Sequence, residues 1–352
     1  MMKKLTALIL ALMLGFSTLI FGGCDSTYHT YSKTYFNTSV YAVVKGEPIS
    51  QEIKNQIDSS LEQIENSLSL TNPNSKLSLF NDSSRAYSAV DEPFAQIYQK
   101  AIALNEFTLG KYNPAVYPLS KLWKLSSDTF DNTRLTVEVP SDLDIEREKA
   151  TALNFNQTEL SGMVLNKCGN DIKLDFGGIA KGYAVDIIKD ILENAGYYNG
   201  YISIGGSSIH IFSVEEDLEI LHPRKSGERI LKVSHNVVFH KSLSTSGDYV
   251  RHYKDQNGKY YSHIIDVDTG APIDTGFQSV TVIGKSACEC DAISTALCCL
   301  EKDEFISFVY NNLYDCAVFG VYEKNGEKLI ITNEKQDNFT LLDDSYLVKY
   351  VI

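Results

Sequence analysis

Positive charge is scarce in this chain. Its 32 lysines and arginines stand against 45 aspartates and glutamates, which gives a formal net charge of −13. Such an acidic surface repels a phosphate backbone, so nucleic acid is not an expected partner. Long apolar runs are scarce too, because no stretch after residue 21 is long enough to cross a bilayer as a helix. Internal repeats and low-complexity tracts are also lacking, and the remainder reads as one large α and β unit.

The cysteines do not follow the spacing of a zinc site. Six of them come after Cys24, and Cys298 and Cys299 are adjacent. An even number in an exported chain could form disulfides, but a domain of this size does not need them. The sequence therefore predicts small buried thiols at most of these positions.

The first residues have the pattern of an export signal. Two lysines precede an apolar core that runs from Leu5 to Phe21, and two glycines then lead to Cys24. This pattern predicts a signal peptide over residues 1–23 and a lipidated cysteine at 24. The alternative is ordinary cleavage nearby, with Cys24 left as a free thiol. Residues 24–34 are polar and are expected to form a tether, with one domain over residues 35–352.

The segment from Asp175 to Asp186 combines an acid, two glycines and a lysine at the start of a helical pattern. A loop that enters a helix leaves backbone N–H groups unpaired, so it attracts anions. Gly177 and Gly178 let a ligand approach the backbone, and Lys181 adds a positive charge. The pattern alone is weak, because many such turns only connect a strand to a helix.

Asp291 and Thr295 are four residues apart, so they share one face of a helix. A carboxylate and a hydroxyl are hard oxygen ligands of the kind that Mg²⁺ takes. The alternative is structural: Asp291 would cap the helix, and Thr295 would bond back to a carbonyl. A third candidate is His263, in a short apolar strand before a Gly/Pro turn, where it could act as a general base. A histidine bonded to a neighbouring strand is the alternative there.

Together these segments resemble the ApbE-type FAD:protein FMN transferases, or flavin transferases. The resemblance extends over nearly the whole chain after the export signal, through seven segments in the family's order: Tyr35–Val40, Gly110–Trp123, Asp175–Asp186, Ile204–Ser207, Ser244–Tyr253, His263–Pro272 and Asp291–Leu297. It implies an α+β fold, with mixed sheets and packed helices in two intimate lobes around a flavin-nucleotide cleft.

The resemblance also implies a reaction and its site. The FMN half of FAD would pass to a Ser or Thr hydroxyl of an exported redox protein, AMP would leave, and Mg²⁺ would clamp the pyrophosphate. His263 matches the base, which predicts weaker transfer at acidic pH. Asp291 and Thr295 match the metal ligands, together with backbone oxygens of Gly178 and Ser294. The positions that match nucleotide or flavin contacts are Phe36, Lys111, Tyr112, Asn113, Asp175, Lys181 and Ile265, with Tyr112 offering a flat face to the flavin ring.

Four positions depart from the family pattern. Asn113 replaces an Asp, Ser207 stands where Asp often follows the glycine pair, and Val267-Asp268 replaces a common Pro-Arg or Pro-Lys. Two other functions stay open: a lipoprotein that binds flavin without transferring it, and a metal-dependent FAD pyrophosphatase. The expected location is the outer face of the bacterial cytoplasmic membrane.

Hydrophobic periodicity predicts the main elements. Helices are expected over 53–68, 94–104 and 181–195, and strands over 40–44, 200–204, 237–240, 277–283, 317–322 and 328–331.

Overall fold

The computed structural model describes residues 27–131, 138–168, 171–213, 217–239, 241–249, 251–254, 260–313 and 315–351. The predicted signal peptide and Cys24 lie outside these residues. Over the part of the chain that is described, no helix is both long and apolar enough to cross a membrane.

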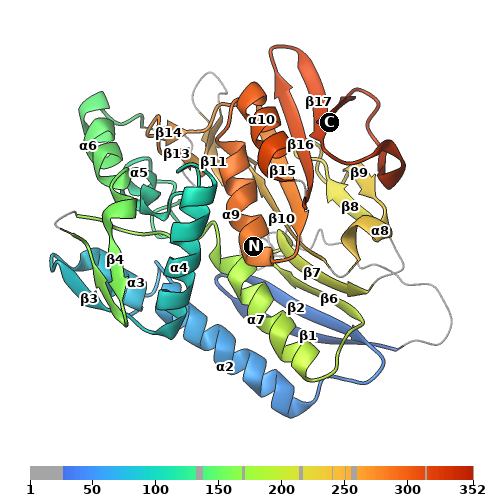
Figure 1. Ribbon diagram of the computed structural model, residues 1–352, viewed down its shortest axis with the longest axis horizontal. Helices are drawn as coiled ribbons and strands as arrows, with labels where there is room; N and C mark the ends of the chain where they lie inside the picture. The colour runs from blue at the N-terminus through green and yellow to red at the C-terminus, as the bar shows by residue number, and fades with distance from the viewer. Residues whose placement is uncertain are drawn as a thin grey trace, which may run out of the picture.

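A nine-stranded sheet forms the centre of the molecule (Figure 1). Neighbouring strands are antiparallel, except that the last pair is parallel. In sheet order the strands are β1 (Tyr28–Tyr35), β2 (Thr38–Lys45), β6 (Gly200–Ile204), β7 (Ser208–Ser213), β10 (Lys241–Gly247), β15 (Phe277–Gly284), β16 (Ala317–Lys324), β17 (Glu327–Thr332) and β19 (Leu347–Tyr350).

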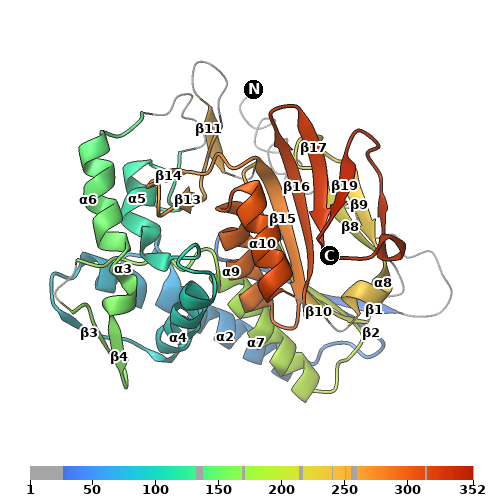
Figure 2. The same ribbon diagram turned by 45° about the horizontal axis from the view of Figure 1, so that its top comes forward.

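Both faces of this sheet are covered. All eight residues of β15 are buried, as expected for a strand that packs on both sides. One face carries α7 (Ala180–Asn194), α9 (Ala287–Cys298) and α10 (Lys302–Asn312), as Figure 2 shows. The other face packs against a small sheet of β8 (Leu218–Leu221), β9 (Arg229–Val233) and β18 (Phe339–Leu341), together with α8 (His235–Val238).

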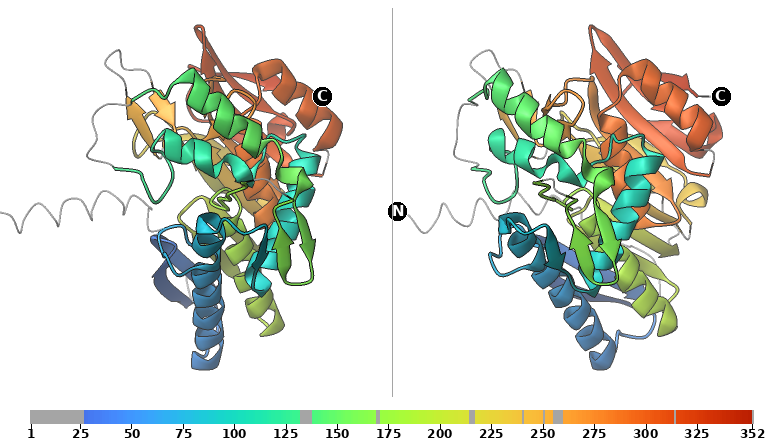
Figure 3. Two further views of the ribbon diagram at one scale, coloured as in Figure 1. Left: turned by 90° about the vertical axis from the view of Figure 1, so that its left-hand side faces the viewer. Right: turned by 60° about the vertical axis from the view of Figure 1, so that its left-hand side comes forward.

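A helical lobe lies beside the main sheet. α2 (Gln51–Leu68) and α4 (Glu92–Phe107) pack towards α7 and α9. Beyond them lie α3 (Lys76–Asp82), α5 (Tyr117–Leu122), α6 (Asp142–Ala152) and a small sheet of β3 (Tyr87–Ala89), β5 (Val164–Asn166) and β4 (Glu159–Ser161). Figure 3 shows α2 (blue) and α6 (green) towards opposite ends of the molecule. The predicted α+β fold is confirmed.

Most predicted elements are present, but two predictions were wrong. Residues 237–238 belong to α8 and not to a strand, because two adjacent buried valines fit a helical turn as well as a strand. The predicted tether is also too long, since Tyr28–Tyr35 is the edge strand β1. Its polar, exposed side chains resemble those of a linker. Between β1 and β2 the chain turns at Phe36 and Asn37, both with positive φ.

The cysteines follow their prediction in most cases. No disulfide forms among the described cysteines, and Cys288, Cys290, Cys298 and Cys299 are buried. Cys316 is half-buried and Cys168 is exposed. The four buried cysteines belong to α9 or to its C-cap, so we attribute them to the packing of this helix rather than to disulfides.

Helices α7 and α9 cross at Gly182. A Cβ at this position would lie 2.1 Å from the carbonyl oxygen of Ala287, so only glycine fits. Each helix also carries an aspartate that caps the other. Asp186 of α7 accepts hydrogen bonds from the backbone N–H of Ala287 (2.9 Å) and Cys288 (3.1 Å) at the start of α9. Asp291 of α9 accepts one from the N–H of Gly182 in the first turn of α7 (3.2 Å).

Gly182→Ala tests this crossing. Because the added methyl group meets backbone rather than a movable side chain, we expect the free energy of unfolding to fall by about 3 kcal/mol or more. Urea denaturation measures it. The control is Asp190→Ala on the exposed side of the same helix, which should stay within about 0.5 kcal/mol of the parent. Equal stability of the two variants would contradict a backbone-to-backbone contact.

Candidate active site

Hydrogen bonds of Asp175 hold the loop that leads into α7. Asp175 Oδ1 accepts a hydrogen bond from the N–H of Gly177 (2.6 Å), and the Asp175 N–H donates to the carbonyl oxygen of Pro114 (2.7 Å). Burial raises the pKa of the Asp175 carboxyl, while Arg251 and Lys181 oppose this rise. The N-cap residue Ile179 supplies no side-chain cap to α7. At this helix start the Ala180 N–H instead donates to the carbonyl oxygen of Phe176 (2.8 Å), and the Gly182 N–H donates to Asp291 (3.2 Å).

Asp291 lies in the second turn of α9 and is only 2 % exposed. Its Oδ1 accepts a hydrogen bond from Ser244 Oγ (2.8 Å). Its Oδ2 lies 3.2 Å from the Gly182 N–H and 3.4 Å from Lys181 Nζ. The predicted helix cap is thus real, but it serves α7. The residue that caps α9 itself is Ser286, five positions earlier than Asp291.

Lys181 connects the glycine loop to α9. Its ammonium donates to the carbonyl oxygen of Gly177 (3.1 Å) and contacts Asp291. A Cβ at Gly205 would lie 3.7 Å from Lys181 Cδ and 3.1 Å from Thr38 Oγ1, so the start of β2 lies beside this lysine. The side chain is 29 % exposed, which leaves its charge accessible to an anion.

Oxygen atoms gather around Thr295. Its hydroxyl donates back to the carbonyl oxygen of Asp291 (2.9 Å), as the structural alternative predicted, and lies 3.0 Å from Ser246 Oγ. Gly178 is adjacent, because a Cβ there would lie 3.4 Å from Thr295 Oγ1. Ser294 is fully buried, and its hydroxyl bonds to Ser246 (2.8 Å) and to the Asp291 carbonyl oxygen (3.1 Å).

This donor set has the chemistry of a magnesium site. It has one carboxylate, hydroxyls and backbone carbonyls, which are hard oxygen ligands. No group of three His, Cys, Asp or Glu side chains that could hold a metal occurs among the described residues. A soft-metal site is not built here, and a hard cation would need waters and substrate phosphates to complete its shell. The residues therefore fit Mg²⁺ only together with a phosphate ligand.

His263 is held by the backbone of Arg251. The carbonyl oxygen of Arg251 accepts hydrogen bonds from the His263 N–H (3.0 Å) and from Nδ1 (3.1 Å). A carbonyl can only accept, so Nδ1 carries the proton and Nε2 keeps its lone pair. Burial, followed by the charge of Arg251, lowers the pKa of His263 from 6.5 to about 3. The imidazole is therefore neutral across the physiological pH range.

Lys111 faces acids rather than open space. Its ammonium lies 2.8 Å from Asp268 Oδ2 and 3.3 Å from Asp266 Oδ1. Burial lowers the pKa of Lys111, but the hydrogen bonds and charges of Asp268 and Asp266 outweigh it and raise the pKa. The ammonium of Lys111 thus neutralises the negative charge that Asp268 introduces. The pair ties residues 110–113 to the turn that follows His263.

Tyr112 and Asn113 are buried, which changes their predicted roles. Tyr112 is 3 % exposed, with its ring against Gly178, so no open face is left for a flavin to stack on. Its hydroxyl has no hydrogen-bond partner among the described residues. Asn113 accepts from the Ala115 N–H (2.9 Å) and donates to the carbonyl oxygen of Ala152 (3.1 Å). An ionised aspartate could not make that second bond, which explains the amide at this position.

The last two predicted contacts lie at the edges of this region. Phe36 is half-buried at the β1–β2 turn, where its N–H donates to Glu65 Oε1 (2.7 Å). Ile265 is 6 % exposed in the short hairpin of β13 (Ile265–Asp266) and β14 (Ala271–Pro272). That hairpin is fixed by a bond from Trp123 Nε1 to the Gly270 carbonyl oxygen (2.9 Å).

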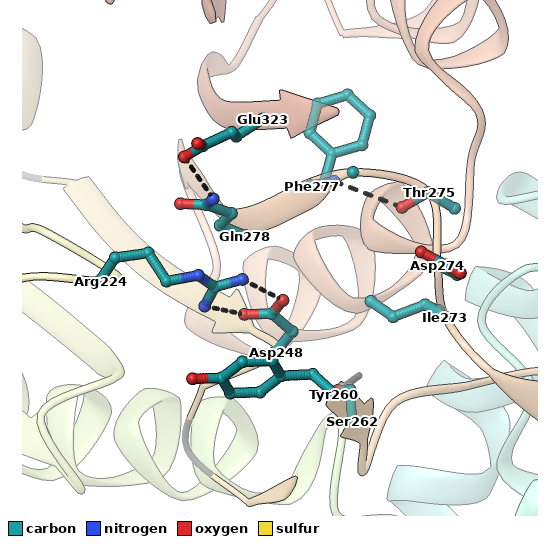
Figure 4. Close-up of a pocket in the computed structure, with 11 residues that line it drawn as sticks. Arg224, Asp248, Tyr260, Ser262, Ile273, Asp274, Thr275, Phe277, Gln278 and Glu323 are labelled. Carbon is teal, nitrogen blue, oxygen red and sulfur yellow. Dashed lines mark hydrogen bonds and ion pairs between the residues drawn. The ribbon is translucent and has the colours of Figure 1, made fainter. Parts of the chain in front are cut away.

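A separate cavity of about 210 Å³ lies beside β12 (Tyr260–Ser262) (Figure 4). Tyr260 and Ser262 line it, whereas His263 does not. Arg224 and Asp248 form a two-point ion pair there, at 2.7 and 2.6 Å. The cavity is smaller than the roughly 300–1,000 Å³ of typical ligand pockets, and its arginine is already paired. None of the predicted site residues lines it.

Three functional positions were missed from the sequence. Ser244 and Ser246 point from β10 to α9, and Arg251 holds His263. The serines stand two residues apart in a strand, which puts them on one face. That spacing could have identified them, but nothing local in the sequence marks Arg251.

Tyr112→Phe tests the unpaired hydroxyl. Because an unsatisfied buried donor is costly, removing it should raise the free energy of unfolding by about 1 kcal/mol. Tyr98→Phe is the matched control, since its buried hydroxyl lies 2.6 Å from Thr158 Oγ1. That variant should lose a similar amount. If thermal denaturation shows both variants equally destabilised, the Tyr112 hydroxyl is bonded in solution.

A charge exchange tests the Lys111 cluster. Lys111→Glu brings a third carboxylate to Asp266 and Asp268, so the melting temperature should fall by several degrees, on the order of 1–2 kcal/mol. Adding Asp268→Lys to that variant should recover at least half of the loss. A double-mutant cycle with no coupling between the two sites would show that the ion pair does not form.

Known protein sequences resemble this chain over most of its length. A model described as the ApbE family matches residues 32–319. An FAD:protein FMN transferase of Vibrio cholerae is 30 % identical over 297 residues, which cover 80 % of this chain and 84 % of that protein. One of Escherichia coli K12 is 30 % identical over 266 residues, covering 72 % and 73 %.

Solved structures also have a fold similar to that of this chain. The flavin transferase ApbE from Vibrio cholerae superposes with a TM-score of 0.73 at 26 % identity, over 86 % of this chain and 95 % of that one. An ApbE protein from Thermotoga maritima also reaches 0.73, at 27 % identity, over 84 % and 94 %. The chain belongs to the ApbE family and is a transferase.

Proposed function

We propose that this protein transfers the FMN half of FAD to a serine or threonine hydroxyl of an exported redox protein, with release of AMP. The observation that carries the proposal is the position of His263. Its Nε2 is neutral and unprotonated, in the same cationic region as Lys181 and Arg251. The relatives named as FAD:protein FMN transferases support the same reaction class.

The step conserves atoms and charge as follows. The acceptor hydroxyl oxygen attacks the phosphorus on the FMN side of the pyrophosphate. The bond from that phosphorus to the bridging oxygen breaks, and AMP leaves with the electron pair. The hydroxyl proton passes to Nε2 of His263, whose orientation is fixed by the Arg251 carbonyl oxygen.

The chain's own residues would bind and orient the substrate. Lys181 and the start of α7 would face the phosphates, and Asp175 orders the loop that leads to them. Asp291 and Thr295, with backbone oxygens of Gly178 and Ser294, would hold Mg²⁺, which supplies Lewis-acid polarisation of the pyrophosphate. Since Lys181 now contacts Asp291, a cation on that carboxylate would free the ammonium for the substrate.

The low pKa of His263 changes the expected pH dependence of the transfer reaction. In the free enzyme His263 would not protonate until the pH approaches 3, so mildly acidic pH should not remove the base. The expectation of weaker transfer near the usual histidine pKa therefore does not hold for the free enzyme. The low pKa also affects folding. Stability should fall as the pH drops from 6.5 towards 3, because the unfolded chain binds the proton first.

The proposal extends to location and partner. The apolar segment before Cys24 supports export with lipid attachment at that residue, which would hold the domain at the outer face of the cytoplasmic membrane. The acceptor would then be an exported redox protein within reach of that surface.

Intact-mass measurement tests the reaction and the base together. With FAD, Mg²⁺ and an exported redox protein that carries a Ser/Thr acceptor site, the acceptor should gain one FMN and one AMP should appear. His263→Ala should slow single-turnover transfer by roughly 10²–10⁴-fold and change FAD affinity little. His235→Ala, at a half-buried histidine of α8, is the control. Tight FAD binding without adduct or AMP would leave a carrier, and AMP without adduct would indicate a pyrophosphatase.

A further inference from the structure

Arg251 is a half-buried cation whose side chain has no partner. Its backbone carbonyl holds His263, but its guanidinium makes no hydrogen bond or ion pair with any residue that the structure describes. Burial lowers the pKa of Arg251, and the carboxylate of Asp175 opposes this without a direct contact. A desolvated charge that is left unpaired is costly, so such an arginine is expected to meet an anion.

The surroundings of this guanidinium say what kind of anion fits. Its charge acts both on the imidazole of His263 and on the carboxylate of Asp175. Asp175 belongs to the glycine loop that leads into α7, where Lys181 carries a second accessible cation. Both cations therefore act electrostatically on His263. A ligand with more than one negative group, such as a pyrophosphate, would match them.

The other arginine near this region shows the contrast. Arg224 donates to both oxygens of Asp248, so its charge is already paired with a carboxylate. The side-chain donors of Arg251 bond to none of the described residues. Its backbone is fixed by the hydrogen bonds that its carbonyl oxygen accepts from His263. A planar guanidinium offers two parallel N–H groups, which suit a phosphate better than an ammonium does.

We propose that the guanidinium of Arg251 binds a phosphate of the dinucleotide substrate and thereby holds the reacting phosphorus beside Nε2 of His263. The inference rests on the proposed function and adds a substrate-binding residue to it. It also has a consequence for the base. Burial lowers the pKa of His263 most and the charge of Arg251 lowers it further, so an anion on Arg251 would remove that second contribution and make the imidazole a stronger base when substrate is bound.

Substitutions at 251 can be made without moving the base, because the backbone carbonyl holds His263. Arg251→Gln should weaken FAD binding, measured by flavin fluorescence with Mg²⁺ and no acceptor, by about ten- to a hundred-fold. Inorganic pyrophosphate should lose affinity by a similar factor in calorimetry. Arg251→Lys should fall between the two proteins, since it keeps the charge and loses the fork. Arg147→Gln, on the exposed side of α6, should match the parent.

Apo stability separates a ligand site from an internal ion pair. If Arg251 is unpaired without substrate, Arg251→Gln should melt at the parent's temperature or above it. A clear fall in melting temperature, with unchanged FAD affinity, would show that Arg251 pairs with Asp175 in solution and would overturn the proposal.

Histidine NMR supplies an independent readout. The charged groups that act on His263 are Arg251 and His252 from the neighbouring segment and Lys181 from α7. Pyrophosphate should raise the pKa of His263 in the parent, and Arg251→Gln alone should raise it in the apo protein. If Arg251→Gln loses FAD affinity but keeps pyrophosphate affinity and the low pKa, Arg251 contacts another part of the dinucleotide. If the parent transfers FMN while Arg251→Gln binds both ligands normally, only this inference fails.

Discussion

The close crossing of α7 and α9 at Gly182 is the contact on which the rest of the site depends. It brings the start of each helix against the side of the other, where an aspartate receives the exposed N–H groups. Asp186 serves this purpose alone. Asp291 has a second role open to it, because its carboxylate also meets Lys181 and Ser244 at the margin of the cleft. A helix cap and a metal ligand are therefore compatible uses of one side chain.

The crossing of α7 and α9 also affects which positive charges near the site are already paired. Anion binding must come from a few local cations, since the net charge of −13 opposes it. Lys181 is restrained by Asp291 and Lys111 is neutralised by Asp266 and Asp268, whereas the Arg251 guanidinium has no ion pair with any described residue. Substrate phosphates would thus meet one free cation and one that a metal could release. Both act on a histidine whose pKa is lowered by burial and by these charges.

Much of this could be predicted from the sequence. Hydrophobic periodicity identified α2, α4 and α7 and the central strands, since their buried faces repeat clearly. The site residues on α7 and α9 came from motif order. Edge and turn features were harder, because the polar strand β1 has the composition of a linker and the Val237-Val238 pair has no period. The burial of Tyr112 and the pairing of Lys111 with Asp268 depend on contacts between distant segments, which local patterns cannot show.

The most direct measurement is the Mg²⁺ dependence of FMN transfer by Asp291→Asn. An asparagine still accepts hydrogen bonds from Gly182 or Ser244 but lacks the negative charge that a cation needs. The account predicts a variant that melts close to the parent and shows little transfer at Mg²⁺ concentrations that saturate the parent. Transfer at the parent's rate under limiting Mg²⁺ would mean that Asp291 only caps α7 and that the metal is bound elsewhere.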